Sequence, residues 1–497
     1  MSYINNRTVH DLRHGGARLL SAILADVVMA KMRAEQVESS TGGALISGSR
    51  DTIISGVSID SRTLHPGDLF FAIRGAHNDG HRYIELALSK GALGVVVDRR
   101  YEVPQGYSPE KILLRVEDTH KALKDLASDI RRQWKGSLVA ITGSMGKTTA
   151  KEFAAQVLQT EYSVYRSPGN YNNLFGLPLA IFGLSPDDHI GIFEMGMSAP
   201  GEIAEMCRIA GPAIGIITNV APVHLAFFNS IEEIAIAKAE LADGLPPGGT
   251  LIYNLDDPRV RGIGNRFPGD KISFGLSADA AVRAFDLEVT GLQETRFQLS
   301  CSGMTRRAAI PLAGAHFVMN ALPAVALASH YHLSLEQIAE SLRFLHQAPS
   351  RGQILRFREG FTVIDDSYNS NPQALMSMLK TFFKVPGCQR RILVAGEMLE
   401  LGNTSESLHY ECGRFAAKCG ADIVVAVQGA ARELARGAAD AGLPKSQVHF
   451  FTEINPAIDF VTRNVQAGDL LLVKGSRGVQ LERVIQTLRS DHGEQIH

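Results

Sequence analysis

Residues 142–149 read TGSMGKTT and carry the residue types that bind phosphate. The apolar run Leu138 to Ile141 precedes them and predicts a buried parallel strand, and the alanine-containing polar segment after them has helical character. A strand, a glycine turn and a helix in this order predict a phosphate-binding loop, because free backbone N–H groups and the helix N-terminus then face an anion. In such a loop the ammonium of Lys147 reaches the outer phosphates, and a hydroxyl of Thr148 or Thr149 binds Mg²⁺.

The loop departs from the common pattern G-x-x-x-x-G-K-[ST] at one position, because Ile141 stands where the first glycine should be. The alternative interpretation is an ordinary glycine-rich turn in front of a helix. The Gly-Lys-Thr-Thr run favours the phosphate loop over that alternative.

Polar groups that could act with this loop follow two later apolar runs. Glu194 follows the run over 190–193, and its carboxylate suits a hard cation such as Mg²⁺. His224 comes soon after the run over 213–217, but histidine is a less usual Mg²⁺ ligand, and by itself His224 is more typical of a structural residue. A polar turn over 169–173, GNYNN, lies between the loop and Glu194.

Lys238 lies on the apolar stripe of a predicted helix. Ser230 and Glu233 form a capping box at its start, and Lys238 comes seven residues after Ile231 on the same face. One interpretation is a lysine that extends from the edge of the stripe to water. The other is a buried lysine with a lowered pKa, whose neutral amine forms a carbamate with CO₂. The residues alone favour the first.

Two further polar clusters follow predicted strands. Asp60-Ser61-Arg62 follows a strand over 53–59, and the arginine fork suits phosphate or carboxylate, although taken alone the cluster is more typical of a surface turn. DDSYNSNP over 365–372 follows a strand over 361–364, and its Asn-Pro pair predicts a helix start. Asn320 enters an alanine-rich helix, either as a cap or as a contact to a base edge.

The elements that position these groups predict an α/β protein of three domains, a number that the length of 497 residues also suggests. We expect residues 1–28 to be a poorly specified N-terminal extension and residues 29–135 a small α/β substrate domain. Residues 136–349 should form a central domain with a P-loop ATPase-like, doubly wound parallel sheet. Residues 350–497 should form a Rossmann-like α/β domain. Thr119 is the expected cap of a helix over 120–134.

Composition limits the classes of function. A formal net charge of −2 gives no electrostatic case for nucleic acid or a membrane surface, and no uninterrupted apolar run reaches the roughly 18 residues of a membrane span. The five cysteines include no C-x-x-C pair, which indicates reduced thiols. We therefore expect a cytoplasmic protein without nucleic-acid binding or membrane insertion.

The phosphate loop, with no glycine at position 141, resembles that of the Mur ligases and the related folylpolyglutamate synthases. The spacing onward to Glu194, His224 and Lys238 is also similar to theirs, and the resemblance covers roughly residues 32–490. The stretches over 365–372 and 396–402 resemble the branch of the family that adds D-alanyl-D-alanine. The Asp-Asn-Pro-Arg motif typical of the diaminopimelate- or lysine-adding branch is absent from the sequence.

The resemblance implies ATP-dependent ligation of D-alanyl-D-alanine to UDP-N-acetylmuramoyl-tripeptide through an acyl phosphate, with ATP and Mg²⁺ as cofactors. We also expect a monomer, and the resemblance implies that its last domain closes over ATP. The nearest alternatives are another Mur-type amide ligase or a folylpolyglutamate synthase. A nucleotide-binding regulator without ligase activity is an alternative from a different class. All of Lys147, Glu194, His224 and Lys238 are present, which counts against it.

The resemblance also implies roles for individual residues, and it reverses the interpretation of Lys238, which matches a carbamylated position. The implied catalytic residues are Lys147, Lys238 and His224, and the implied metal ligands are Thr148, Glu194, His224 and Lys238. The implied nucleotide contacts are Gly143, Ser144, Met145, Gly146, Lys147, Thr148, Thr149, Asn173, Asn320, Arg351 and Asp366. The implied substrate contacts are Ser61, Arg62, Asn172, Asn369 and Asn371. Met145 and Glu397 depart from the usual residues, and Tyr368, which stands where another branch has a lysine, is assigned no catalytic role.

Overall fold

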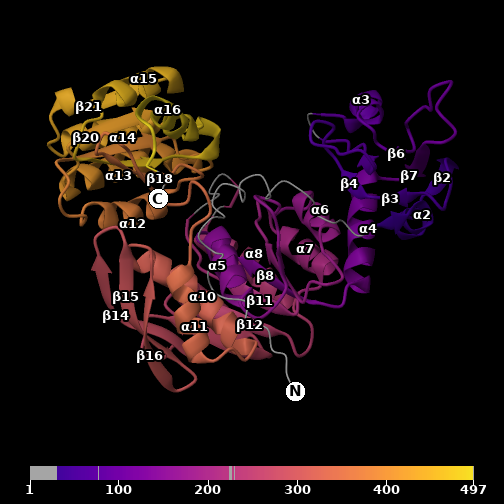
Figure 1. Cartoon of the computed structure of the whole chain (residues 1–497), viewed down its shortest axis with the longest axis horizontal. Coiled ribbons are helices and arrows are strands. Elements are labelled where there is room, and N and C mark those ends of the chain that lie inside the picture. The colour runs from indigo at the N-terminus through magenta and orange to yellow at the C-terminus, as the bar shows by residue number, and fades with distance from the viewer. Residues whose placement is uncertain (1–30, 76–77, 223–226, 229, 496–497) are drawn as a thin grey trace, which may run out of the picture. The chain divides into compact units, whose positions relative to one another are not determined.

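The computed structural model describes residues 31–75, 78–222, 227–228 and 230–495. The chain divides into two compact units, Met1–Lys135 with Pro178–Asp188, and Gly136–Leu177 with His189–His497. The expected α/β class is confirmed, since the three main sheets have five, nine and six strands and alternate with helices (Figure 1). The expected N-terminal extension, residues 1–28, lies outside the described residues.

The first unit contains the five-stranded sheet, in the order β2-β7-β6-β5-β4. Strands β4 to β7 are parallel and β2 is antiparallel to β7. The strand expected over 53–59 is divided between β3, which pairs with β1, and β4. The bounds are β1 Met32–Arg33, β2 Ala44–Ser47, β3 Ile53–Ile54, β4 Gly56–Ser58, β5 Asp68–Phe71, β6 Gly94–Asp98, β7 Ile112–Val116, α2 Ala34–Thr41, η1 Gly80–Tyr83, α3 Ile84–Ser89 and α4 Thr119–Gln133.

The expected cap of helix α4 is wrong by one residue. Asp118 has an extended backbone and its side chain accepts a hydrogen bond from the N–H of Lys121, so Asp118 is the cap. Thr119 is instead the first helical residue, and its buried hydroxyl donates to the carbonyl of Ala72 after β5 at 3.0 Å. The tertiary contact with the sheet therefore decides which of two adjacent capping residues is used.

The second unit contains the nine-stranded sheet, in the order β16-β15-β14-β13-β12-β11-β8-β10-β9. Strands β8 to β14 are parallel, and β15 and β16 extend the sheet in antiparallel fashion. The strand bounds are β8 Ser137–Thr142, β9 Val164–Arg166, β10 Ile190–Glu194, β11 Ile214–Ile217, β12 Thr250–Asn254, β13 Asp270–Gly275, β14 Val282–Thr290, β15 Glu294–Cys301 and β16 Met304–Ile310. The helix bounds are α5 Lys147–Leu158, α6 Gly176–Phe182, α7 Glu202–Ala210, α8 Ile231–Asp243, α9 Pro258–Arg266, α10 Ala315–His330, α11 Leu335–Ser341 and η2 Leu342–Phe344.

The centre of this sheet is covered on both faces. Every residue of β10 and β11 is buried, as the continuous apolar runs predict for inner parallel strands. Helices α5 and α10 pack together (Figure 1), and small alanine side chains in α10 allow this close approach. The phosphate loop therefore lies between a buried strand and a helix that are both held in place by the core.

The six-stranded sheet, in the order β17-β18-β22-β19-β20-β21, carries the C-terminal part of the chain. Strand β17 is antiparallel and the others are parallel. Alternate residues of β19 enter different hydrophobic clusters, Leu393 on one side and Val394 on the other. The bounds are β17 Gln353–Arg356, β18 Thr362–Asp366, β19 Arg390–Gly396, β20 Ile423–Val427, β21 Val448–Phe451, β22 Asp469–Lys474, α12 Pro372–Phe382, η3 Gly402–Thr404, α13 Ser405–Cys419, α14 Ala431–Asp440, η4 Lys445–Gln447, α15 Ile454–Asn464, η5 Arg477–Val479 and α16 Glu482–His492.

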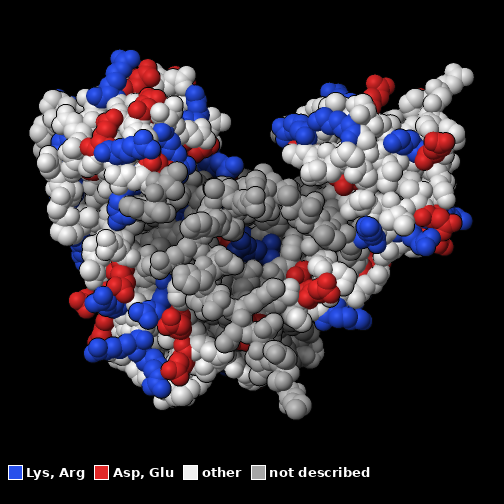
Figure 2. All heavy atoms as spheres, viewed as in Figure 1, with Lys and Arg blue, Asp and Glu red and all other residues white. Residues whose placement is uncertain are grey.

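Charged side chains of both signs are interspersed on the C-terminal part, as Figure 2 shows at its upper left. Nothing in this view gathers charges of one sign over a whole domain face. In the described part of the chain, no helix combines the length and apolar character that a membrane crossing needs.

Candidate functional site

The predicted phosphate loop connects β8 to α5, which begins at Lys147. Gly143 and Gly146 have φ angles of +149° and +77°, so both positions favour glycine. Neither position has room for a side chain, because a Cβ on Gly143 would lie 1.9 Å from Oγ1 of Thr218 and one on Gly146 would lie 2.2 Å from Oδ1 of Asn320. Asn320 thus lies against the loop itself.

The end of β11 holds the loop in shape. The N–H of Met145 donates to Oδ1 of Asn219 at 2.9 Å, and the hydroxyl of Thr218 donates to the carbonyl of Met145 at 2.7 Å. The hydroxyl of Ser144 donates to the carbonyl of Ala221 at 3.1 Å. These bonds fix the backbone at the carboxyl end of the parallel strands, where α/β sheets bind ligands.

Lys147 is half-buried and its side chain folds back onto the loop that precedes it. Its amine donates to the carbonyl of Gly143 at 2.8 Å. Burial lowers the pKa of Lys147 and the charge of Arg351 lowers it further, while the carboxylate of Glu194 acts in the opposite direction. The amine therefore lies in a site where an added anion would be strongly favoured.

Glu194, at the end of β10, connects two of the predicted positions. Its Oε2 accepts from the Thr148 hydroxyl at 2.7 Å, and its Oε1 accepts from Nδ2 of Asn172 at 2.9 Å. Burial would raise the pKa of Glu194, but the nearby Lys147 charge and the two hydrogen bonds outweigh it and lower the pKa below its usual value. Glu194 is therefore an ionised carboxylate at neutral pH.

Arg351 reaches the loop from the connection before β17. Its Nη2 donates to the Thr148 hydroxyl at 3.1 Å, although the two residues are 203 positions apart. Asp366, at the end of β18, forms an ion pair of 2.6 Å with the buried Lys474. Lys474 also donates to the carbonyl of Asn369 at 2.9 Å, and the sequence reasoning gave it no role.

Lys238 is only 2% exposed, so the interpretation of a lysine that extends to water is wrong. Burial lowers the pKa of Lys238 well below its usual value, and the nearby Lys147 charge lowers it further. Within the described residues, its amine has no ion pair or hydrogen bond. Such an amine is favoured in its neutral form.

The described groups fit a Mg²⁺ ion in their chemistry. Glu194 and Thr148 supply oxygen atoms beside the phosphate loop, and Mg²⁺ in nucleotide sites typically uses one or two protein oxygens together with phosphate and water. The described residues contain no group of three or more His, Cys, Asp or Glu side chains that could hold a metal ion by themselves. The predicted ligand His224 lies outside the described residues.

Three of the predicted asparagines use their side-chain oxygens locally. Oδ1 of Asn173 accepts from the N–H of Gly176 at 2.8 Å at the start of α6. Oδ1 of Asn371 accepts from the N–H of Ala374 at 2.9 Å and caps α12, which confirms the predicted helix start. Oδ1 of Asn369 accepts from the N–H of Ser370 at 2.9 Å. Their amide nitrogens are the groups left for a ligand.

In the first unit, Ser61 and Arg62 follow β4, as the sequence predicts. Ser61 is buried, whereas the Arg62 side chain is 84% exposed and binds Asp60 at 2.7 Å. This hydrogen bond is the main cause that lowers the pKa of Asp60. Arg62 is thus an accessible cation whose charge is partly offset by its neighbour.

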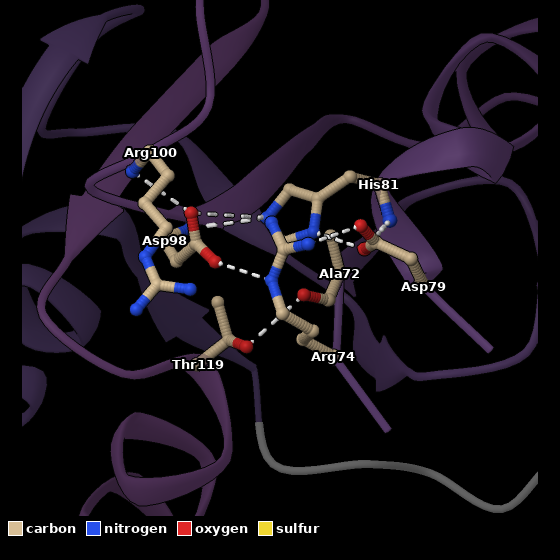
Figure 3. Close-up of polar contacts among 7 residues, drawn as sticks. All are labelled: Ala72, Arg74, Asp79, His81, Asp98, Arg100 and Thr119. Atoms are coloured by element: carbon tan, nitrogen blue, oxygen red, sulfur yellow. Dashed lines mark hydrogen bonds and ion pairs between the residues drawn. The ribbon is translucent and has the colours of Figure 1, made fainter. Parts of the chain in front are cut away.

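The sequence reasoning missed a polar cluster after β5 and β6 (Figure 3). Arg74 donates to Asp98 at 3.0 Å and also binds Asp79. His81 accepts at Nε2 from the N–H of Asp98 at 3.2 Å, so its ring proton is on Nδ1, which lies 2.6 Å from Asp79. The cluster joins two strand ends of the first unit. Polar residues directly after an apolar run were the available signal.

Lys151 was also missed, although it lies one helical turn after Lys147. It is 1% exposed, and its amine donates to the carbonyl of Ser167 at 2.6 Å. This bond fixes the start of the segment that carries Asn172 to Glu194. Its spacing of four from Lys147 was a signal for a shared helix face.

Three family models match successive parts of the chain. The model described as Mur ligase family, catalytic domain, matches residues 53–131, and Mur ligase middle domain matches residues 141–328. The model described as Mur ligase, glutamate ligase domain, matches residues 350–477. Lys147, Glu194 and Lys238 lie within the second match, and Arg351 lies within the third.

Curated and solved relatives cover nearly the same length. The UDP-N-acetylmuramoyl-tripeptide–D-alanyl-D-alanine ligase of Bacillus subtilis (strain 168) is 33% identical over 437 residues, which are 88% of this chain and 93% of that protein. A crystal structure of MurF from Acinetobacter baumannii has a TM-score of 0.84 at 28% identity and covers 93% of this chain and 100% of that one. MurF ligase from Thermotoga maritima in complex with ADP has a TM-score of 0.76 at 26% identity, covering 88% and 97%.

Proposed function

Because this chain belongs to the Mur ligase family, we propose that it adds D-alanyl-D-alanine to UDP-N-acetylmuramoyl-tripeptide with conversion of ATP to ADP and phosphate. The product is the UDP-muramoyl-pentapeptide of peptidoglycan synthesis, and the reaction takes place in the cytoplasm on a monomer. The observation that carries this proposal is the group of Lys147, Thr148 and Glu194 at the carboxyl end of the central sheet.

The reaction follows from the weakness of a carboxylate as an acyl donor. The terminal carboxylate of the tripeptide attacks the γ-phosphorus of ATP, and ADP leaves with the bridging oxygen. The amine of D-alanyl-D-alanine then attacks the acyl phosphate, loses a proton, and expels inorganic phosphate. Backbone N–H groups at the start of α5, from Gly146 to Thr149, orient the phosphates, and the Lys147 ammonium offsets the negative charge of the transferring phosphoryl group.

Mg²⁺ would be held by Thr148 and Glu194, with Lys238 and His224 as further proposed ligands. Bound there, it would offset negative charge on the phosphates of ATP. Thr148 also accepts from Arg351, so its hydroxyl proton is directed to Glu194 and its second lone pair is free for a cation. The protein's contribution is to fix the positions of the Thr148 hydroxyl and the Glu194 carboxylate.

In this proposal Lys238 becomes a metal ligand after its amine has reacted with CO₂. Its buried neutral amine adds CO₂ and releases one proton, which leaves a carbamate with two oxygen atoms. The carbamate would place a negative charge next to Lys147, where the unmodified amine is neutral. This negative charge offsets part of the positive charge beside the loop.

The remaining predicted residues act as ligand contacts in the proposal. Asn173, Asn320, Arg351 and Asp366 bind the nucleotide. Ser61 and Arg62, in the domain over 29–135, bind the UDP-muramoyl-tripeptide. Asn172, in the domain over 136–349, and Asn369 and Asn371, in the domain over 350–497, contact the substrates. The side-chain amides of these asparagines are suited to carbonyl and carboxylate oxygens.

The decisive experiment measures phosphate release from ATP with one amine acceptor at a time. We expect release only when UDP-muramoyl-tripeptide and D-alanyl-D-alanine are both present. UDP-muramoyl-dipeptide with diaminopimelate or lysine tests the neighbouring branch of the family, and a folate with glutamate tests the folylpolyglutamate synthases. Release with either of these pairs, and none with D-alanyl-D-alanine, would refute the proposal.

A further inference from the structure

Tyr368 lies beneath two arginines in the C-terminal part of the second unit. The guanidinium carbon of Arg351 is 3.9 Å from the centre of the Tyr368 ring, and that of Arg477 is 5.0 Å from it. Both distances are within the range in which a cation is attracted to an aromatic ring. Among the described residues the Tyr368 hydroxyl has no hydrogen-bond partner, so the ring makes these contacts.

The two guanidinium groups lack a compensating carboxylate. Within the described part of the chain neither Arg351 nor Arg477 forms an ion pair, whereas neighbouring Lys474 is paired with Asp366. Arg351 instead donates to Thr148 and lies near enough to Lys147 to lower the pKa of that amine. Several cations on one side of the phosphate loop repel one another, and an anion bound there would offset this repulsion.

The backbone around Arg351 also directs it to this place. Ser350 and Gly352 on either side have φ angles of +58° and +85°. The N–H of Tyr368 donates to the carbonyl of Ser350 at 3.2 Å, and the hydroxyl of Ser350 donates to Asp365 at 3.0 Å. A non-glycine residue in the left-handed region is retained where surrounding contacts fix it, and such positions are frequent at functional sites.

We infer that Tyr368 is a positioning residue whose ring holds Arg351 at the phosphate loop and gathers Arg477 beside it, so that both guanidiniums bind the terminal phosphate of the nucleotide. This inference rests on the proposed ATP-dependent reaction and adds two residues to it. The aromatic face replaces a carboxylate as the partner of each arginine. A carboxylate would neutralise the arginines, whereas a ring orients them and leaves their charge available to the phosphate.

The test measures binding by isothermal titration calorimetry with two probes, ADP and the non-hydrolysable ATP analogue AMP-PNP. Tyr368→Leu removes the ring face, and we expect its affinity for AMP-PNP to fall about tenfold, with a smaller loss for ADP. Arg477→Met should lower the affinity for AMP-PNP to a similar extent. The double variant should lose little more affinity than either single variant. Tyr368→Phe keeps the ring and should restore the wild-type affinity.

Phe450→Leu is the matched control, because the guanidinium carbon of Arg432 lies 5.1 Å from the centre of the Phe450 ring. This pair is in the same domain but away from the loop. The variant removes an equivalent contact and should leave AMP-PNP binding unchanged. Thermal unfolding midpoints identify any variant that fails to fold, and the exposed Arg477 gives a variant that does not depend on the packing of Tyr368. Wild-type affinity in Tyr368→Leu or Arg477→Met, or an equal loss for ADP and AMP-PNP, would overturn the inference.

The phosphate-release assay on the same proteins separates this inference from the proposed function. If wild-type protein binds AMP-PNP but ligates no acceptor, the ligase proposal fails. Calorimetry still tests whether Tyr368 and Arg477 contribute to AMP-PNP affinity. If wild-type protein ligates D-alanyl-D-alanine and Tyr368→Leu keeps its kcat and its KM for ATP, the arginine pair fails while the ligase proposal stands.

Discussion

Lys147, Lys238 and Glu194 determine the charge of the candidate site. Lys238 is buried and Lys147 is half-buried, and desolvation is the main cause that lowers the pKa of each. The pKa of Glu194 is lowered because Lys147 and two hydrogen bonds outweigh its burial. Because Lys238 is favoured in its neutral form, the charged groups of this set are the Lys147 ammonium and the Glu194 carboxylate. The desolvated ammonium of Lys147 favours binding of an anion such as a nucleotide phosphate.

Replacing Lys147 by methionine should reduce ADP formation by a factor of at least about 10², the usual cost of losing one donor to a developing charge. Methionine keeps the apolar stem and removes only the ammonium group. Lys418→Met is the control, because Lys418 is exposed on α13. Equal kcat in Lys147→Met and wild type would contradict the assigned role of Lys147 in phosphoryl transfer.

His316 predicts a pH dependence of stability. Its Nε2 is buried without a hydrogen-bond partner, and burial, with a contribution from Lys474, lowers the pKa of His316 to about 4. Between pH 6.5 and pH 4 the unfolded chain therefore binds a proton that the folded chain does not, so this group destabilises the fold as the pH falls. Between pH 7 and pH 5 the cost is about 2 kcal/mol.

His316→Gln removes this titration and keeps a polar side chain. Urea unfolding should show that the wild type loses about 2 kcal/mol more than the variant between pH 7 and pH 5. Groups other than His316 titrate in both proteins and cancel in this difference. Parallel loss in the two proteins would show that His316 is protonated in the folded state.

At the scale of elements, the phosphate loop depends on two glycines with no room for a Cβ. Gly143→Ala should abolish AMP-PNP binding, since its Cβ would meet Thr218 at 1.9 Å and displace the loop. Gly201→Ala is the matched control, because Gly201 also has a positive φ, of +87°, but open space around it. The control should lose roughly 1 kcal/mol of stability and bind AMP-PNP normally. Equal affinities in the two variants would contradict a rigid loop.

The sequence predicts elements better than it predicts their partners. The apolar runs over 138–141, 190–193 and 213–217 match β8, β10 and β11 within one residue at each end, because buried parallel strands are continuous apolar runs with clear ends. The antiparallel β15 and β16 were not predicted. In β15, buried residues alternate with more exposed ones, and an alternating pattern does not reveal which sheet the strand joins.

The candidate site shows the same division. Glycine and lysine spacing identified Lys147 and Thr148, because their geometry is local. The hydrogen bonds from Arg351 to Thr148 and from Lys151 to Ser167 depend on the tertiary structure. Lys238 was misjudged from the residues alone, because the stripe of a helix does not report whether another layer covers its edge.

At the scale of the whole molecule, the proposed ligand contacts belong to both compact units. Ser61 and Arg62 belong to the first unit, and Lys147, Arg351 and Asp366 belong to the second. If Ser61 and Arg62 hold the tripeptide as proposed, its reacting carboxylate must still reach ATP bound beside Lys147, so the proposed reaction requires groups of both units. The acyl phosphate intermediate also reacts with water unless water is excluded.

We therefore expect the protein to become more compact when both ligands bind. Small-angle X-ray scattering should give a smaller radius of gyration with UDP-muramoyl-tripeptide and AMP-PNP together than without ligands. AMP-PNP alone should give a smaller decrease, because it engages only the expected closure of residues 350–497 over the nucleotide. Lys147→Met with the same ligands is the control, since weakened nucleotide binding should reduce the change. An unchanged radius, with calorimetry showing both ligands bound, would mean that the groups of the two units are already in place and that no closure accompanies the reaction.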